Sequence, residues 1–178
     1  LLAAGVSIGL RAVMHFRPEF QYLNLLSDPI PLKIPDGMKE ADSIPARPGE
    51  FAGHNVLLVT LDTTRADRLG CYGNKKIETP TFDHLAQRGV LFSKAIATGP
   101  TTLPSHATIL TGLYPHHHGA RANSIYRLKD DNRTLAEVFS EQGYATGAVI
   151  SAFVLDSRYG LAQGFDEYDD RLFKSSDS

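Results

Sequence analysis

The chain has 178 residues, of which 42% are hydrophobic, and this is enough for one domain with a core of its own. Its 18 basic and 20 acidic side chains nearly cancel, so the composition indicates no surface for nucleic acid or another polyanion. The single cysteine, Cys71, excludes an internal disulfide and a cysteine-based zinc cluster. Because the sequence starts at Leu1 and not at Met, we expect a fragment of a longer protein, cut at both ends.

The first 53 residues differ in composition from the rest. Residues 1–10 are apolar and uncharged, but a bilayer span needs about 20 such residues. They are typical of the end of a signal peptide or membrane anchor, and a buried helix is the alternative. Residues 11–53 are rich in proline and predict an extended connector. This organisation indicates a protein that is exported, periplasmic, or anchored in a membrane and facing outside.

The folded part is expected over residues 54–178 and opens with an apolar run, residues 56–61, rich in β-branched side chains. Such a run is typical of a parallel strand buried on both faces. Asp62 follows directly, at the carboxyl end of the predicted strand, where α/β proteins place their ligand sites. It is either a metal ligand or a loop-capping residue that accepts from backbone N–H groups such as those of Thr64 or Arg65.

Further strands and helices alternate along the chain. A helix begins at Pro80 and stops at Gly89, a strand covers residues 90–97, and a helix covers residues 104–111. A capping box of Thr134 and Glu137 predicts the next helix, and residues 144–150 a third strand. The alternation predicts an α/β fold with a mainly parallel sheet flanked by helices.

Thr102 stands where the helix over residues 104–111 begins. A helix start exposes unpaired backbone N–H groups and the positive end of the helix dipole, so an anion can dock there. A hydroxyl at that place could be activated to attack the anion. The alternative is that Thr101 or Thr102 is an ordinary N-cap.

Three consecutive histidines, His116 to His118, invite a metal interpretation. We expect a solvated loop here, because neighbours in an extended segment point in opposite directions and cannot all bind one ion.

The motifs together resemble the sulfatase family of the alkaline-phosphatase-like superfamily. The resemblance runs over about residues 54–170 and includes the run that ends in Asp62-Thr63-Thr64-Arg65, the stretch Thr102-Leu103-Pro104-Ser105-His106, and the later stretch Gly164-Phe165-Asp166. It implies an N-terminal portion of a sulfatase-like catalytic domain.

The resemblance also implies roles for particular residues. Asp62 matches a metal-binding aspartate, and Thr102 matches the nucleophile position of the Cys/Ser-x-Pro-Ser-Arg signature, where it would also contact the metal. The metal would be a divalent ion, Ca, Zn, Mn or Mg. Asn123 matches an asparagine that holds the oxygens of the transferred group, and His106 and His118 are weaker candidates for substrate contacts. The substrate would be a small-molecule, glycan or lipid ester.

Three departures from the family pattern bear on the activity. Threonine cannot be converted to formylglycine, Thr63 stands where many members have a second aspartate, and His106 replaces the signature arginine. We therefore expect a metal-dependent hydrolase or transferase of sulfate or phosphate esters, with phosphodiester chemistry favoured. The alternatives are a non-catalytic sulfatase-like domain and a membrane-tethered phospho-group transferase of the cell envelope. Because the remaining metal ligands are missing, we expect the 178-residue piece to be inactive on its own.

Overall fold

The computed structural model describes residues 49–171. They form two compact units, with the boundary between Ile96 and Ala97, and each unit has its own core. The signal peptide or anchor expected over residues 1–10 lies outside the described residues, and so does nearly all of the connector over 11–53. No helix within residues 49–171 is long and apolar enough to cross a lipid bilayer.

The first unit contains two short 3-10 helices and one α-helix. These are η2 (Ala66–Arg68), η3 (Gly70–Tyr72) and α1 (Pro80–Arg88). The predicted helix start at Pro80 and stop at Gly89 are both confirmed. Its small core consists of Leu69, Cys71 and Tyr72, with Phe82 and Ala86 of α1 packed against it.

The two strands predicted in this unit are not present in the structure. Residues 56–61 and 90–96 form no strand, and the apolar side chains of Leu57 and Ile96 are 85% and 80% exposed. A strand requires a hydrogen-bonding neighbour, and the strands of the described part, β1 and β2, pair with each other. The sequence pattern of a buried strand is therefore not realised in this part of the chain.

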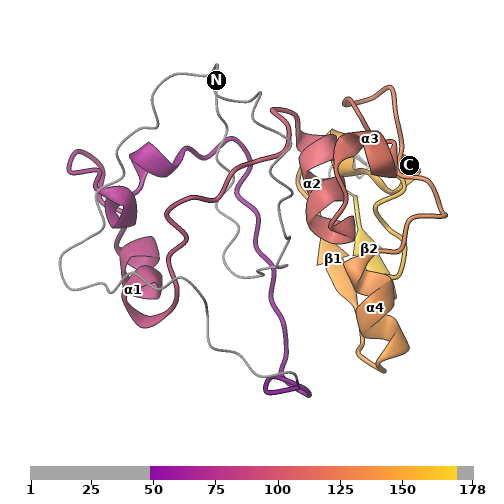
Figure 1. The fold of residues 1–178 in the computed structure, drawn as a ribbon, viewed down its shortest axis with the longest axis horizontal. Coiled ribbons are helices and arrows are strands. Elements are labelled where there is room, and N and C mark those ends of the chain that lie inside the picture. Colours follow the sequence, from indigo (N-terminus) through magenta and orange to yellow (C-terminus); the bar gives the residue numbers. More distant parts are fainter. Residues whose placement is uncertain (1–48, 172–178) are drawn as a thin grey trace, which may run out of the picture. The chain divides into compact units, whose positions relative to one another are not determined.

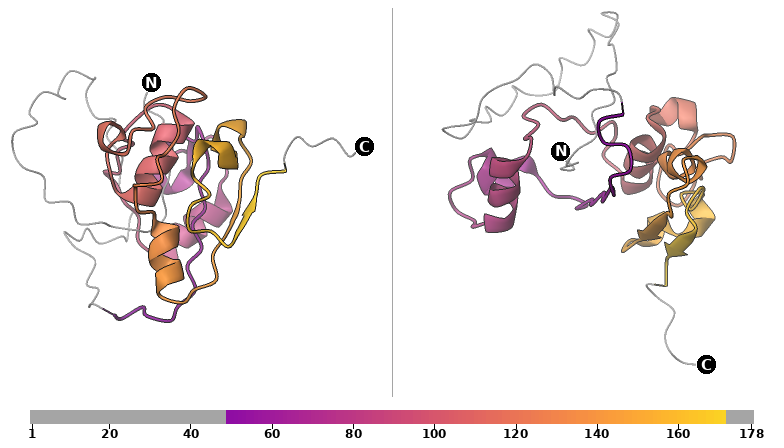
Figure 2. Two further views of the ribbon diagram at one scale, coloured as in Figure 1. Left: turned by 90° about the vertical axis from the view of Figure 1, so that its right-hand side faces the viewer. Right: turned by 90° about the horizontal axis from the view of Figure 1, so that it is seen from below.

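The second unit holds a parallel pair of strands with helices around it. It contains α2 (Thr102–Thr111), α3 (Pro115–His118), α4 (Leu135–Glu141), β1 (Gly147–Val149), η4 (Phe153–Leu155), η5 (Ser157–Tyr159) and β2 (Glu167–Asp169), as Figure 1 shows. Strand β1 pairs with β2 in parallel, with Ala148 opposite Tyr168. The two strands also lie side by side in the views of Figure 2. The α/β class with a parallel sheet is confirmed, although the strand predicted over 144–150 is shorter than expected.

Helix α2 supplies the centre of the second core. Leu103 and Ala107 lie four residues apart on one face and are fully buried, and Leu110 continues that face. They pack with Leu128 and Leu161, which come from later loops. This packing fixes α2 in the unit, and α2 in turn carries Thr102.

The start of α4 agrees with the sequence prediction, whereas α3 replaces a predicted loop. The capping box before α4 is confirmed, since the Glu137 N–H donates to Thr134 Oγ1 at 3.2 Å and the Thr134 N–H donates to Glu137 Oε2 at 2.7 Å. The solvated loop expected over the three histidines is wrong, because they form the last three residues of α3. Pro115 suits the first turn of a helix, and Gly119 ends it with a φ of 84°.

Candidate functional site

Thr102 is the first residue of α2, two positions earlier than the predicted start at Pro104. The N-cap is Thr101, with φ −120° and ψ 149°, and its side chain makes no capping hydrogen bond. Of the alternative that Thr101 or Thr102 is the N-cap, Thr101 is confirmed by its position, although its side chain does not cap the helix. Pro104 is accommodated because it stands in the first turn, where its missing N–H costs little.

Asn123 takes the capping role that Thr101 does not fill. The Leu103 N–H donates to Asn123 Oδ1 at 2.9 Å, and Asn123 lies 20 positions after Leu103 in the chain. A cap side chain normally accepts from the second or third N–H of a helix, and Leu103 provides the second. The structure thus brings two of the predicted site residues, Thr102 and Asn123, to the same end of α2.

His106 lies one helical turn after Thr102 and turns back toward it. Its Nδ1 contacts the Thr102 carbonyl oxygen at 2.8 Å. A carbonyl oxygen can only accept, so Nδ1 of His106 is the donor in this contact. The His106 side chain is thereby hydrogen-bonded to the backbone of Thr102.

His118 is fully buried, and both of its ring nitrogens have partners. Its ring is fully buried, the Ala120 N–H donates to Nδ1 at 3.1 Å, and Nε2 contacts Thr108 Oγ1 at 3.2 Å. Burial lowers the pKa of His118 below its usual value, so the neutral ring is favoured. Both ring nitrogens are engaged inside the protein, and the weaker expectation of a substrate contact stays a prediction.

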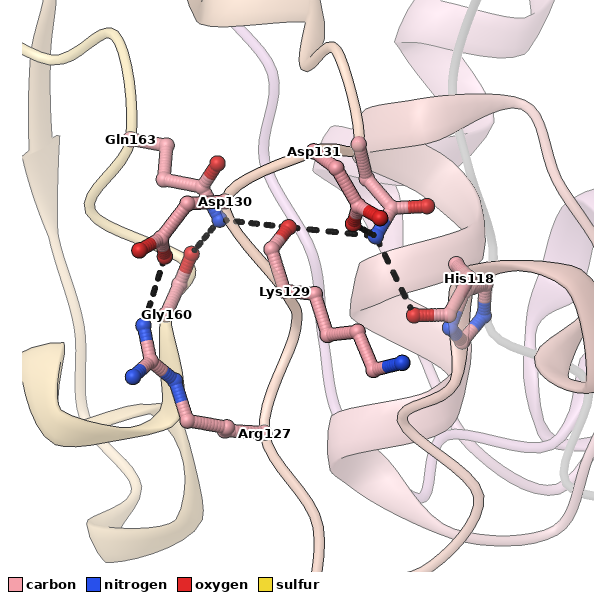
Figure 3. A network of polar contacts seen from close by, with 8 residues as sticks. His118, Arg127, Lys129, Asp130, Asp131, Gly160 and Gln163 are labelled. Carbon is pink, nitrogen blue, oxygen red and sulfur yellow. Dashed lines mark hydrogen bonds and ion pairs between the residues drawn. The ribbon is translucent and has the colours of Figure 1, made fainter.

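A polar network holds the loop that carries Asn123. The side-chain amide of Asn132 donates to the carbonyl oxygens of His118 at 3.3 Å and Lys129 at 3.1 Å. From the other side, Gln163 Nε2 donates to the carbonyl oxygens of Lys129 and of Gly160, the latter at 2.7 Å (Figure 3). The segment between α3 and α4 is therefore held at the backbone oxygens of His118 and Lys129.

Asp62 lies in the first unit, and its carboxylate Oδ1 accepts from the Thr63 N–H at 2.9 Å. This resembles the loop-capping alternative, but with Thr63 as the donor in place of Thr64 or Arg65. Arg65 pairs instead with Asp67, and this pairing lowers the pKa of Asp67. The meeting of Asp62 with Thr102 around one ion stays a prediction.

Backbone strain marks both candidate positions. In the described residues, the non-glycine residues with a positive φ are Thr63, at 57°, and Ser124, at 62°. Each directly follows a predicted site residue, Asp62 or Asn123. Strained backbone of this kind is concentrated at functional sites.

The described residues alone do not fit a divalent ion. No three His, Cys, Asp or Glu side chains within residues 49–171 gather closely enough to hold one. Asp62 offers one carboxylate and Thr102 one hydroxyl, whereas such ions need more ligands. Any metal would require further ligands from other segments of the protein.

The comparison with known proteins agrees with this fold. The parallel pair with its surrounding helices is part of an α/β domain. A family model described as Sulfatase matches residues 54–176, so the chain belongs to the sulfatase family, as the motifs predict.

Named relatives come from animals and bacteria. Human arylsulfatase D is 35% identical over 105 residues, a match that covers 53% of this chain and 18% of that protein. Rat steryl-sulfatase is 38% identical over 114 residues, or 58% of this chain and 19% of that protein. A solved structure of a 2-O GAG sulfatase matches with a TM-score of 0.50 and 31% identity, over 58% of this chain and 22% of that one. The chain thus matches about a fifth of the length of these relatives.

Proposed function

We propose that the complete protein is a sulfatase-family hydrolase or transferase that acts on a sulfate or phosphate ester, with Thr102 as the nucleophile. The observation that supports this most strongly is the placement of Thr102 as the first residue of α2, beside Asn123. The side-chain N–H donors of Asn123 would stabilise the oxygens of the transferred group, because the Leu103 N–H is already bonded to Asn123 Oδ1 and Pro104 has no N–H.

The chemistry of threonine favours phosphoryl transfer. In the first step the Thr102 hydroxyl gives up its proton and its oxygen forms a bond to phosphorus, while the ester P–O bond breaks and the ester oxygen takes up a proton and leaves as the alcohol. Water or another acceptor then attacks phosphorus, and the hydroxyl of Thr102 is regenerated. A threonine sulfate, in contrast, is a stable alkyl sulfate that requires a second attack at sulfur, and Thr102 cannot form the aldehyde of formylglycine.

The relatives support the sulfate ester as the second candidate. Their names describe sulfatases, including a steryl-sulfatase from rat and an N-acetylgalactosamine-6-O-sulfatase from Bacteroides thetaiotaomicron. A small-molecule, sterol or glycan ester is therefore the substrate class that we propose. A divalent ion, when bound, would supply positive charge to neutralise the developing oxyanion, with Asp62 as one ligand.

Assays of the complete protein on aryl sulfates, aryl phosphodiesters and phosphonate esters test this proposal. Replacing Thr102 with Ala should lower turnover by about a thousandfold or more, as loss of an activated nucleophile usually does. Thr102→Ser keeps a hydroxyl and should retain most activity. Thr101→Ala is the matched control, because the Thr101 side chain makes no capping hydrogen bond. Unchanged turnover in Thr102→Ala would exclude Thr102 as the nucleophile, whereas a wild-type protein that turns over none of these esters would favour a non-catalytic sulfatase-like domain.

A further inference from the structure

The two hydrogen bonds at the start of α2 meet on one peptide group. The carbonyl oxygen of Thr102 accepts from His106 Nδ1 at 2.8 Å, and the N–H of Leu103 donates to Asn123 Oδ1 at 2.9 Å. The Thr102 carbonyl and the Leu103 N–H belong to the same planar peptide unit. Side chains from two different segments therefore hold both polar ends of the peptide bond that follows Thr102.

We propose that His106 and Asn123 are positioning residues that clamp this peptide group and so fix the backbone at Thr102. The planar unit has its position set by contacts at its two ends, so rotation about the Thr102 Cα–C bond (ψ) is restricted. Because the side chain of Thr102 leaves the same Cα, a fixed backbone limits the directions in which its hydroxyl points. We name this pair of contacts the peptide clamp.

The burial of Leu103 makes its hydrogen bond to Asn123 costly to lose. Leu103 and Pro104 are buried beside it, and Leu103 is fully inaccessible to solvent. A buried N–H that loses its acceptor keeps the cost of leaving water, so Asn123 is needed to satisfy Leu103. On the other side, helical side chains lean toward the N-terminus, which brings the His106 ring back over the first turn.

The clamp also sets the orientation of both side chains. A backbone N–H can only donate, so the atom of Asn123 that meets Leu103 is Oδ1, and its Nδ2 group lies on the other side of the amide. Likewise Nδ1 of His106 is committed to the carbonyl. This positioning role differs from a direct substrate contact, and it rests on the proposed function only where it concerns catalysis by Thr102.

Amide hydrogen exchange on the complete protein tests the clamp without any assay of activity. Asn123→Ala should make the Leu103 amide exchange about tenfold faster, the factor expected for one lost hydrogen bond. Asn123→Asp keeps an acceptor and should leave exchange near the wild-type rate. The amides of Ile109 and Leu110, later in α2, serve as the internal reference. Unchanged exchange at Leu103 in Asn123→Ala would overturn the clamp.

Kinetics with the His106 variants test whether the clamp positions Thr102. His106→Ala should lower kcat at least about tenfold with little change in KM, since small misplacement of a reacting group is costly. His106→Asn places an N–H donor close to the position of Nδ1 and should restore kcat to within about threefold of wild type. His84→Ala, an exposed histidine on α1, is the matched control.

The outcomes separate this inference from the proposed function. Activity that survives Thr102→Ala contradicts the nucleophile, while the exchange data still decide whether the clamp exists. Two outcomes would overturn the positioning role. One is an unaffected kcat in Asn123→Ala although its Leu103 exchange has accelerated, and the other is a His106→Asn variant no more active than His106→Ala.

Discussion

Gly160 packs against the backbone carbonyl of Leu128 with no room for a side chain. A Cβ built on Gly160 would fall well inside van der Waals contact with that oxygen. The two segments are held together next to this point, where the Leu128 N–H donates to the Tyr159 carbonyl oxygen at 2.8 Å. Gly160 also has a left-handed φ of 83°, which residues other than glycine adopt only with strain.

We therefore expect Gly160→Ala to lower the free energy of unfolding by about 3 kcal/mol, because backbone strain and a backbone clash add. The matched control is Gly143→Ala, where φ is 80° but nothing lies within 4 Å of the added Cβ. That variant should lose only about 1 kcal/mol, from the left-handed backbone alone. Urea denaturation of the complete protein measures both, and equal losses would show that the Leu128 contact is unimportant.

The second prediction concerns the cap of α4. Thr134 is fully buried, and its hydroxyl donates to the Gln163 carbonyl oxygen at 3.0 Å while it accepts from the Glu137 N–H. Thr134→Ala removes both contacts and should lower the free energy of unfolding by about 2 kcal/mol. Thr134→Ser keeps the hydroxyl and should recover most of this loss.

Thr101 provides the contrast for this prediction. It is also an N-cap threonine, but its side chain makes no capping bond, so Thr101→Ala should change stability by less than about 0.5 kcal/mol. Thermal denaturation of the three variants in parallel gives the comparison. A Thr101 variant as unstable as the Thr134 variant would contradict the assignment of the caps.

The features that the sequence predicts correctly are those that depend on a few neighbouring residues. The capping box at Thr134 and the Pro80 start and Gly89 stop of α1 depend on neighbouring residues, and the structure has each of them. Residues 56–61 show the opposite case, because a strand depends on a partner that the local sequence does not specify. Their apolar side chains predicted burial, and Leu57 is 85% exposed.

The candidate site divides in the same way. The motif placed Thr102 at a helix start and named Asn123 and His106, but it gave them contacts with a substrate. That both side chains bind the Thr102–Leu103 peptide group could not be predicted, because this depends on how the loop after α3 folds back on α2. The burial of His118 was missed for a similar reason: a polar residue in a His-rich run is expected in solvent, and tertiary packing reversed this.

The third prediction concerns acid sensitivity through His118. Its pKa in the folded protein is lowered by burial from an ordinary value of 6.5. The ring faces Thr108, the Ala120 N–H and the Pro104 backbone, and a charged His116 nearby would lower the pKa further. Below pH 6.5 the unfolded chain therefore binds a proton that the folded protein resists.

The lowered pKa of His118 makes the folded protein less stable in acid. Its free energy of unfolding should be highest above pH 6.5 and should fall below that pH, by up to about 1.4 kcal/mol per pH unit. Urea midpoints between about pH 7.5 and 5 measure the loss in the complete protein. His118→Asn, whose Oδ1 can accept from Ala120, should have a flatter profile in this window. The exposed His117 is the control, and His117→Gln should follow the wild type.

The last prediction concerns the thiol of Cys71. It is 6% exposed, and burial together with the nearby carboxylate of Asp83 raises its pKa. The thiolate is the reactive form, so iodoacetamide should modify Cys71 at least about a hundredfold more slowly in the folded protein than in urea. Mass spectrometry of the peptide that contains Cys71 follows the reaction directly. Asp83→Asn removes the nearby charge but keeps an oxygen that can accept from the Thr79 hydroxyl, so the packing should be retained. If burial is the main cause of the raised pKa of Cys71, this variant should react only slightly faster than the wild type. Rapid modification of the folded wild type would show that η3 opens readily and that the small core around Leu69 and Tyr72 does not protect it.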